Sequence, residues 1–435
     1  MTIGGLKKTS SPLALVAAAG FLMGGMALTP AMAADLGGDC CADLEERVAE
    51  LEATTARKGN RKVSLTISGH VARSVGWYED DGARYDPVAK KYIASGPQGS
   101  EWYSAGHGVS GSRVQFSGSA QLTSTWTAGY TLRLRFSGDR TSDVLKSTTT
   151  TAGGAGGSGS GSISHDRNFV YLKNARLGTF LIGEAGAPTD GVSNISLGGH
   201  GVVGDSAGTD WNGSTIQGTD LEQGTHQAIA WISPTVRGFT LAVAWADLNY
   251  SAANGAALDD GDSASDAWDF ALRYAQEFGP IRLAAGIGYT TVDNDDDIEG
   301  SNVMGSIAVM HTPTGLNISF AAGTEVDGGV GTTTITTNPN YTANPGDTEF
   351  WHIAGGINRD FTGLGNTSIF GEYGEYDYDV VNVDPVQMWG IGVVQHFDSA
   401  ATELYIAYRS WEADETVATH DGDVRQLMAG MRIKF

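Results

Sequence analysis

The sequence predicts an all-β protein: a sixteen-stranded antiparallel transmembrane β-barrel with a short N-terminal helical segment. Three observations predict this fold. Sixteen segments of about ten residues alternate apolar and polar side chains, as tilted bilayer-crossing strands do. Short and long connections alternate along the chain, which places every long connection at one end of the barrel. The last strand, 424–435, ends on an aromatic residue, Phe435. A soluble sandwich could also end in a strand, but it has no reason to gather its long loops at one end.

The first 33 residues have the pattern of a secretory signal peptide. Lys7 and Lys8 precede an apolar run, 13–28, and the small residues at 31–33 form a cleavage site. We expect cleavage before Ala34, which removes two positive charges and changes the formal net charge from −23 to −25. The alternative, a retained membrane anchor, is disfavoured by the many small residues in the apolar run.

Residues 34–62 are expected to form a periplasmic helix followed by a basic linker. A spacing of three and four indicates the a and d positions of a coiled coil: Cys41, Leu44, Val48, Leu51 and Thr55. Two heptads are too few to associate alone, so the helix would join barrels that are already side by side. A single surface helix is the alternative. The adjacent Cys40 and Cys41 cannot staple the fold; they either link copies or are dispensable.

The barrel itself is expected to occupy 63–435. Its strands are predicted at 63–76, 112–123, 126–137, 166–174, 176–184, 226–233, 236–248, 266–278, 281–292, 300–312, 314–324, 348–361, 366–377, 386–397, 401–411 and 424–435. In the third strand, Leu132 and Leu134 share the apolar face, and Arg133 and Arg135 share the other. Arg73 is an exception, because strict alternation places it on the lipid face. Either a bulge intervenes there or Arg73 meets another subunit.

Three stretches resemble the general porins of alphaproteobacteria, of the rhizobial and Brucella type. They are CCADLEERVAELEATTARKGNRKVSLTISGHV at 40–71, DRNFVYLKNARLGTFLIGEAGAPTDG at 166–191, and the terminal strand. The resemblance implies a homotrimer of sixteen-stranded, water-filled barrels that pass small solutes. It also implies that the third long connection folds inward, and that Ala34 with Asp35 could tie the chain to peptidoglycan.

That third connection, Ala185 to Thr225, is expected to narrow the pore. It has no Lys or Arg, and its acids are Asp190, Asp205, Asp210, Asp220 and Glu222. The predicted lumen face supplies arginines opposite them: Arg113, Arg133, Arg135, Arg273 and Arg409. Acids facing arginines would set a transverse field that orients water and screens out apolar solutes. The alternative for the arginines is wall-to-loop salt bridging without a role in selectivity.

These features predict a passive diffusion porin of the Gram-negative outer membrane with a weak preference for cations. The expected partners are outer-membrane lipid and lipopolysaccharide, small hydrophilic solutes and further copies of the chain. No cofactor or metal site is expected, and the acidic balance argues against nucleic-acid binding. The alternatives are a substrate-specific channel, which would show aromatic and charged ladders in the lumen, and a barrel enzyme. The enzyme is disfavoured because no histidine sits in a recognisable motif with a serine.

Overall fold

The computed structural model describes residues 62–80, 83–86, 91–94, 99–106, 110–137, 162–204, 224–247, 265–294, 298–326, 348–377, 385–412 and 423–435. The expected signal peptide and N-terminal helix, with Ala34, Cys41, Leu44, Val48 and Leu51, lie outside the described residues. None of the helices in the described ranges is long and apolar enough to cross a membrane.

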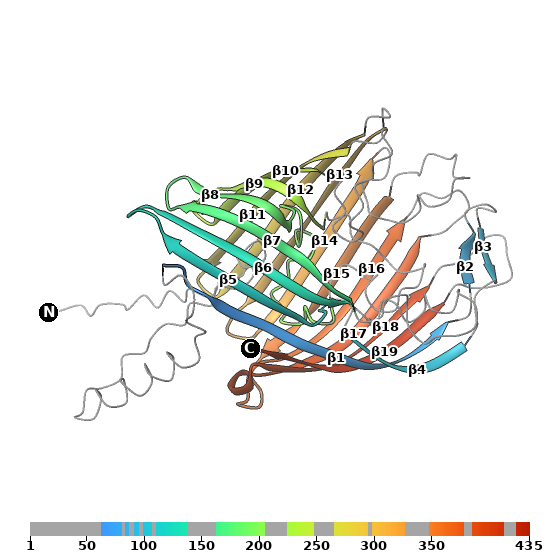
Figure 1. Cartoon of the computed structure of the whole chain (residues 1–435). Coiled ribbons are helices and arrows are strands. Elements are labelled where there is room, and N and C mark those ends of the chain that lie inside the picture. Colours follow the sequence, from blue (N-terminus) through green and yellow to red (C-terminus); the bar gives the residue numbers. More distant parts are fainter. Residues whose placement is uncertain are drawn as a thin grey trace, which may run out of the picture.

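The described chain is almost entirely β-strand (Figure 1). The strands are β1 (Thr66–Asp80), β2 (Ala83–Asp86), β3 (Lys91–Ala94), β4 (Gly99–Gly106), β5 (Arg113–Gln121), β6 (Trp126–Ser137), β7 (Ser162–Asn174), β8 (Gly178–Gly186), β9 (Thr225–Ile232), β10 (Phe239–Asp247), β11 (Ser265–Phe278), β12 (Ile281–Asn294), β13 (Ile298–His311), β14 (Leu316–Val326), β15 (Thr348–Arg359), β16 (Thr367–Asp377), β17 (Val386–Phe397), β18 (Thr402–Glu412) and β19 (Val424–Lys434). A short 3-10 helix, Asp398–Ala400, joins β17 to β18.

From β5 to β19 each strand pairs antiparallel with the next one, and both β5 and β19 pair with β1, so the sheet closes on itself. Seventeen strands make this sheet, yet the barrel has sixteen positions. The difference arises because β4 and β5 share one position beside β1. β4 pairs with residues 73–80 of β1, and β5 pairs with residues 66–70. The predicted sixteen-stranded antiparallel barrel is confirmed. The sequence reading missed β4 and the separate β2–β3 hairpin.

The two faces of the wall follow the period of two. Along β1, buried Ala72 and Ser74 alternate with Val71 and Val75, each 53% exposed. Along β18, buried Glu403 and Tyr405 alternate with exposed Leu404 and Ile406 in the same way. The apolar exposed set faces lipid and the other set faces the lumen, because a spanning barrel needs an apolar outer band.

The short connections lie at one end of the barrel, together with the start of β1 and the C-terminus (Figure 1). They are 122–125, 175–177, 233–238, 279–280, 312–315, 360–366 and 398–401. The other ends of these strands lie at the opposite end of the barrel, called the outer end below.

Two irregularities of the expected pattern are explained by the structure. The β1–β19 register runs without a shift from His70 to Asp80, so Arg73 is exposed on the outer face without a bulge. A bulge does occur between β6 and β7, where the register shifts at Arg133 and Leu134. It turns Phe169 and Tyr171 toward the lumen, where both side chains are buried.

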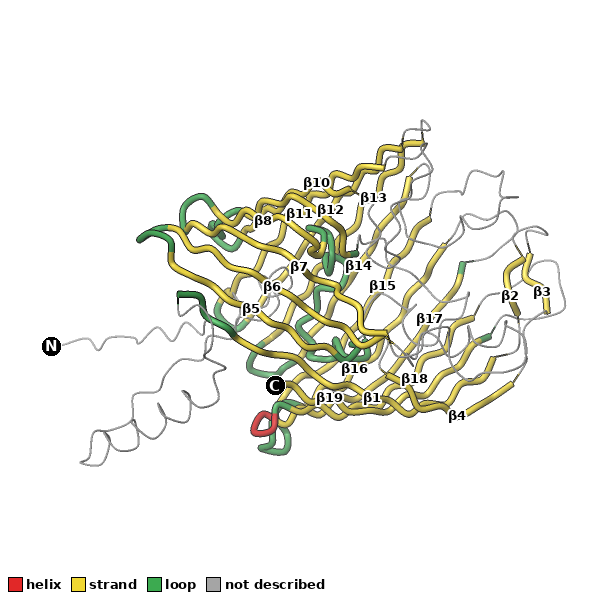
Figure 2. Tube along the Cα trace, in the orientation of Figure 1, coloured by secondary structure: helices red, strands yellow, loops and turns green. Residues whose placement is uncertain are grey.

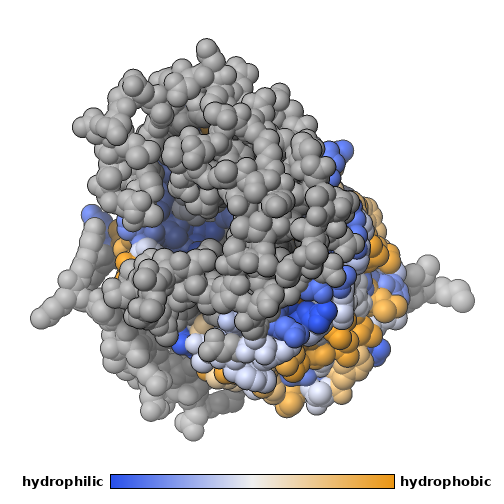
Figure 3. Space-filling view, turned by 90° about the vertical axis from the view of Figure 1, so that its right-hand side faces the viewer, coloured by the Kyte–Doolittle hydropathy of each residue, from blue (hydrophilic) through white to orange (hydrophobic). Residues whose placement is uncertain are grey.

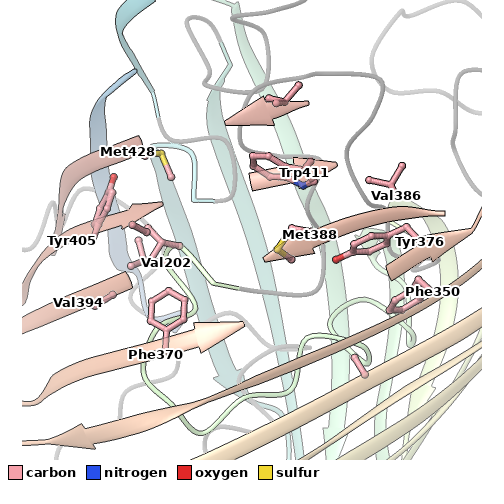
Figure 4. Packing of buried hydrophobic residues seen from close by; sticks show 14 of the residues in the cluster. Val202, Phe350, Phe370, Tyr376, Val386, Met388, Val394, Tyr405, Trp411 and Met428 are labelled. Carbon is pink, nitrogen blue, oxygen red and sulfur yellow. The ribbon is translucent and has the colours of Figure 1, made fainter. Parts of the chain in front are cut away.

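The lumen face carries small side chains on some strands and large side chains on others. Small residues do line β10 and β11, but β15 to β19 present aromatic and sulfur-containing side chains that pack together (Figure 4). Trp411 belongs to this lumen cluster and is fully buried, so it does not lie at the membrane–water interface.

Candidate functional site

The first half of the third long connection, 187–204, folds back into the barrel and lies against the inner wall (Figure 2). It contacts lumen-facing side chains from β11 to β17. Val192, Val202 and Val203 are buried in the same cluster as lumen residues of β15 to β19. Figure 3, from the outer end, shows hydrophilic residues deep inside the barrel.

Two charged residues of β11 hold the start of this segment. Asp269 accepts hydrogen bonds from the backbone N–H and the hydroxyl of Thr189, both at 2.7 Å, and from the Thr290 hydroxyl at 2.7 Å. Arg273 donates to the carbonyls of Pro188 at 3.0 Å and Asp190 at 2.6 Å. Asp269 and Arg273 are 2% and 4% exposed, so this anchor is shielded from water and its charge-assisted bonds are strong.

The next stretch is held by hydroxyls on two further strands. Ser306 of β13 accepts from the N–H of Ile195 at 3.1 Å and donates to the carbonyl of Val192. Ser368 of β16 donates to the carbonyl of Gly198. These bonds satisfy the backbone of a connection that has no regular structure of its own, and they fix it across the inner wall.

The end of the segment is held by rings. His200 stacks on Phe370 of β16 with ring centroids 4.4 Å apart, and His396 of β17 donates to the carbonyl of Gly199 at 2.9 Å. His200 is only 2% exposed, and this burial lowers its pKa to about 4. His200 is therefore neutral at pH 7.

The wall of β5 to β7 carries four arginines side by side. Arg113 lies directly opposite Arg135, and Arg133 lies directly opposite Arg167 of β7. Like charges at directly opposite positions destabilise a sheet. This arrangement therefore concentrates positive charge on one side of the lumen at a cost in stability.

Two carboxylates partly balance the four arginines. Asp166, placed by the β6–β7 bulge, accepts from Arg133 through both oxygens at 2.5 and 2.6 Å. Asp190, from the inward-folded segment, lies 3.8 Å from Arg167. Of the predicted acids in the third connection, Asp190 is the one within the described residues, and it does face the arginine wall. Asp205, Asp210, Asp220 and Glu222 lie outside them.

Two predicted arginines have other surroundings. Arg273 is on the lumen side but binds loop carbonyls, as described above. Arg409 is fully buried and binds Glu372 through two nitrogens, at 2.7 and 3.0 Å, while His352 lies 3.2 Å from the same carboxylate. For these two arginines the salt-bridging and structural alternative describes the geometry better than a solute-facing role.

The sequence reading missed several members of this site: Asp166, Arg167, Asp269 and Glu372. Asp269 had a usable signal, since it stands between Trp268 and Phe270 in a strictly alternating strand and so must face inward. Asp166 and Arg167 had none, because the bulge breaks the alternation there. Within the described ranges, no three His, Cys, Asp or Glu side chains are grouped to hold a metal ion.

Comparison with known proteins supports a channel. Residues 14–416 match the family described as Gram-negative porin, so the chain belongs to that family. The fold is similar to that of an anion-selective porin from Comamonas acidovorans, with TM-score 0.52 and 15% identity, covering 86% of this chain and 100% of that one. It is also similar to the outer membrane channel DcaP of Acinetobacter baumannii, with TM-score 0.53 and 12% identity over 87% and 99% of the two chains.

A third similar structure is Salmonella typhi OmpF in complex with daunomycin, with TM-score 0.52 and 12% identity over 86% and 98%. Comparison with curated protein sequences finds no match. At these identities the structural likenesses establish the fold, and family membership makes the chain a porin-type channel of the outer membrane.

Proposed function

We propose that the chain forms a water-filled channel for passive diffusion of small hydrophilic solutes and ions, without catalytic activity. The observation that carries this proposal is the position of 187–204. A segment anchored through Asp269, Ser306 and Ser368 lies inside the barrel and narrows its lumen, and its Asp190 faces a wall of arginines. A fixed, polar constriction suits selection by size and charge.

We further propose a weak preference for cations. The whole chain has a formal net charge of −23, and its third connection contributes five acids and no Lys or Arg. The arginines of β5 to β7 act against this preference, which keeps it weak. Exposed charges across a wide wet pore interact over a screening length of about 10 Å at 0.1 M salt, so the preference should fade as salt rises.

The proposed assembly is a homotrimer, with the processed chain beginning at Ala34 and its N-terminal segment in the periplasm. Its basis is the resemblance of 40–71 and 166–191 to alphaproteobacterial general porins, to which we assign the chain. A similar fold, OmpT of Vibrio cholerae, has been solved in a trimer form, with TM-score 0.51 and 10% identity over 86% of this chain and 99% of that one. Attachment to peptidoglycan through Ala34 and contact with lipopolysaccharide belong to the same proposal.

Planar-bilayer recording tests the proposal. We expect stepwise conductance that grows with salt without saturating, and a small reversal potential of cationic sign under a salt gradient. Asp205→Asn with Asp210→Asn should move the reversal potential toward anions, whereas Asp295→Asn with Asp296→Asn, in another acidic stretch, should leave it unchanged. Absence of conductance, or an equal effect of the two pairs, would overturn the assigned role of the third connection.

A substrate-specific channel is the second candidate. The four adjacent arginines and the aromatic residues on the lumen face of β15 to β19 are the features that favour it. Conductance that saturates with one class of organic anion, and is blocked by it at low concentration, would favour this candidate over passive diffusion.

A further inference from the structure

The end of the inward-folded segment is held at three consecutive residues. Ser368 of β16 donates to the carbonyl of Gly198, and His396 of β17 donates to the carbonyl of Gly199 at 2.9 Å. The ring of His200, the next residue, stacks on a ring of β16. Gly199 has a φ of 74°, in the left-handed region, so the chain turns sharply here. The contact through His396 continues on the far side of its ring to a charged group.

Both ring nitrogens of His396 face oxygen acceptors. Nε2 lies 2.9 Å from the carbonyl oxygen of Gly199, and Nδ1 lies 3.4 Å from Oε1 of Glu403. A carbonyl and a carboxylate can accept hydrogen bonds but cannot donate them. A neutral imidazole has one N–H and one nitrogen without a proton, whereas an imidazolium has two N–H groups. The protonated ring alone can therefore donate to both oxygens at once.

Glu403 of β18 is fixed in place without the segment. It is 3% exposed, and both Arg432 and Lys434 of β19 donate to it. Arg432 also donates to the hydroxyl of Ser110 at 2.6 Å, which ties the carboxylate to the residues just before β5. Glu403 therefore presents a fixed negative charge to the histidine ring.

The charges around this ring favour its protonated form. Glu403 is in contact with the ring and shielded from water, so its attraction is strong. Lys434 opposes it, but the Lys434 side chain is 47% exposed and water screens its charge. Arg432 is bound to the other carboxylate oxygen. His200 is neutral at pH 7, and Asp398 in the next turn is exposed.

We propose that Glu403 is a positioning residue of the constriction. It holds His396 in the doubly donating form, and that form docks the end of 187–204 against the wall. When the ring loses a proton, its one remaining N–H points to the carboxylate, because charge-assisted hydrogen bonds are the stronger ones. A nitrogen without a proton then faces the carbonyl of Gly199, and this bond is lost.

Alkaline pH should therefore release the end of the segment. The docked state holds the proton more tightly than the undocked state, so docking weakens as pH rises, by at most about tenfold per pH unit. The direction is opposite to that of His200, whose buried ring docks in the neutral form. The inference rests on the proposed channel function, since it assigns the group that positions the constriction of that channel.

Planar-bilayer recording of the full-length protein from pH 6.5 to 9 tests this proposal. We expect the open-channel noise of the wild type to rise several-fold across this range. His396→Gln keeps an N–H for the carbonyl of Gly199 but cannot titrate, so its noise should stay level. Glu403→Gln removes the charge that holds the proton, and Lys434→Gln is added to keep the net charge of the cluster unchanged. In this double variant the rise should begin at least about one pH unit lower.

Hydrogen exchange over 196–204 is the second readout. Wild type and variants are compared at the same pH, so that the intrinsic pH dependence of exchange cancels. The wild type should exchange several-fold faster than His396→Gln at pH 9 and at the same rate at pH 6.5. His311→Gln is the matched control, because His311 bonds Thr314 in the turn after β13, and it should behave as the wild type does.

Three outcomes would overturn the proposal. One is the same pH response in His396→Gln and the wild type, and another is loss of the response in His311→Gln as well. The third is an unchanged onset in the Glu403 double variant, which would remove Glu403 as the positioning residue. Hydrogen exchange needs no conductance, so it decides this proposal even if the recordings contradict the channel.

Discussion

The last residue of the chain, Phe435, closes the barrel on Gly69. The N–H of Gly69 donates to the Phe435 carbonyl at 2.8 Å, and the N–H of Phe435 donates to the Gly69 carbonyl at 3.0 Å. These two bonds extend the β1–β19 ladder by one pair beyond His70 and Lys434. The Phe435 ring reaches over Gly69, where a Cβ would lie 2.9 Å from the ring's Cζ. Phe435 therefore pairs with β1 through its backbone and covers Gly69 with its ring.

Deleting Phe435 should impair assembly and leave the conductance of any assembled barrel unchanged. The deletion leaves the N–H and the carbonyl of Gly69 without partners where β1 meets β19. This junction faces lipid, and each unpaired backbone group there costs several kcal/mol of folding free energy. The measurement is the amount of heat-modifiable barrel in the outer membrane, with Phe435→Tyr as the control that keeps the ring. Normal membrane levels of the truncated chain would show that the terminal pair is dispensable.

Gly69→Ala should also impair closure. A Cβ at Gly69 would lie 2.4 Å from the carbonyl oxygen of Arg113, a backbone atom that cannot swing away, so β1 or β5 must shift. Gly371→Ala on the outer face of β16 is the matched control, because its Cβ would come no closer than 3.8 Å to another group. We expect Gly69→Ala to lower the unfolding temperature and Gly371→Ala to leave it unchanged. Equal losses in the two variants would mean that general glycine replacement, and not this contact, is responsible.

The strands could be predicted from sequence because one bilayer-facing side forces a period of two over about ten residues. β10 shows this plainly, with Phe239, Leu241 and Val243 outward and Ala242 and Ala244 inward. β4 was not predicted because it lies within a long connection and shares with β5 a single position in the barrel. No periodicity in the sequence reveals that two segments share one partner strand.

The site was harder to predict, since a lumen-facing charge can meet water, a loop or another wall residue. Alternation placed Arg133 and Arg409 on the same face, but Arg133 joins the arginine wall while Arg409 is buried against Glu372. The difference depends on the acids that the closed barrel brings beside each arginine, Asp166 beside Arg133 and Glu372 beside Arg409. The third connection's inward fold came from family resemblance, while its anchors required the three-dimensional register.

Asp269→Asn should loosen the start of the inward-folded segment. The buried carboxylate accepts three hydrogen bonds, and an amide replaces one acceptor oxygen by a donor that faces a Thr hydroxyl or N–H. We expect a loss of about 1–3 kcal/mol in local stability, seen as faster hydrogen exchange over 187–195 and noisier open-channel current. Asp266→Asn, an exposed outer-face residue of the same strand, should change neither. Unchanged exchange in Asp269→Asn would place the anchor elsewhere.

Acid should release the end of the segment through His200. Its pKa is lowered to about 4 by burial, whereas an undocked histidine titrates near 6.5. Above pH 6.5 both states are neutral. Below it the undocked state binds the proton more readily, so docking loses about 1.4 kcal/mol per pH unit until pH reaches about 4. Glu372 opposes this loss, and His352 and Arg409 add to it.

The measurement is open-channel noise as pH falls from 7 to 4, compared between the wild type and His200→Asn. The wild type should become noisier through this range. The variant, which has no titrating ring against Phe370, should show a flatter profile. Parallel profiles would assign the pH response to other groups, such as the His396–Glu403 pair.

Ion selectivity should respond to the arginine wall and not to the outer face. Arg113→Gln with Arg135→Gln removes two directly opposed cations from the lumen. The reversal potential should therefore move toward cations, and conductance should rise because two long side chains are shortened. The shift in reversal potential should shrink at high salt, because the screening length falls to about 3 Å at 1 M. Arg73→Gln is the control: it removes the same charge from the exposed outer face of β1 and should leave the reversal potential unchanged. If Arg73→Gln moves selectivity as far as the lumen pair does, then net charge governs permeation, and the wall of β5 to β7 has no special part in it.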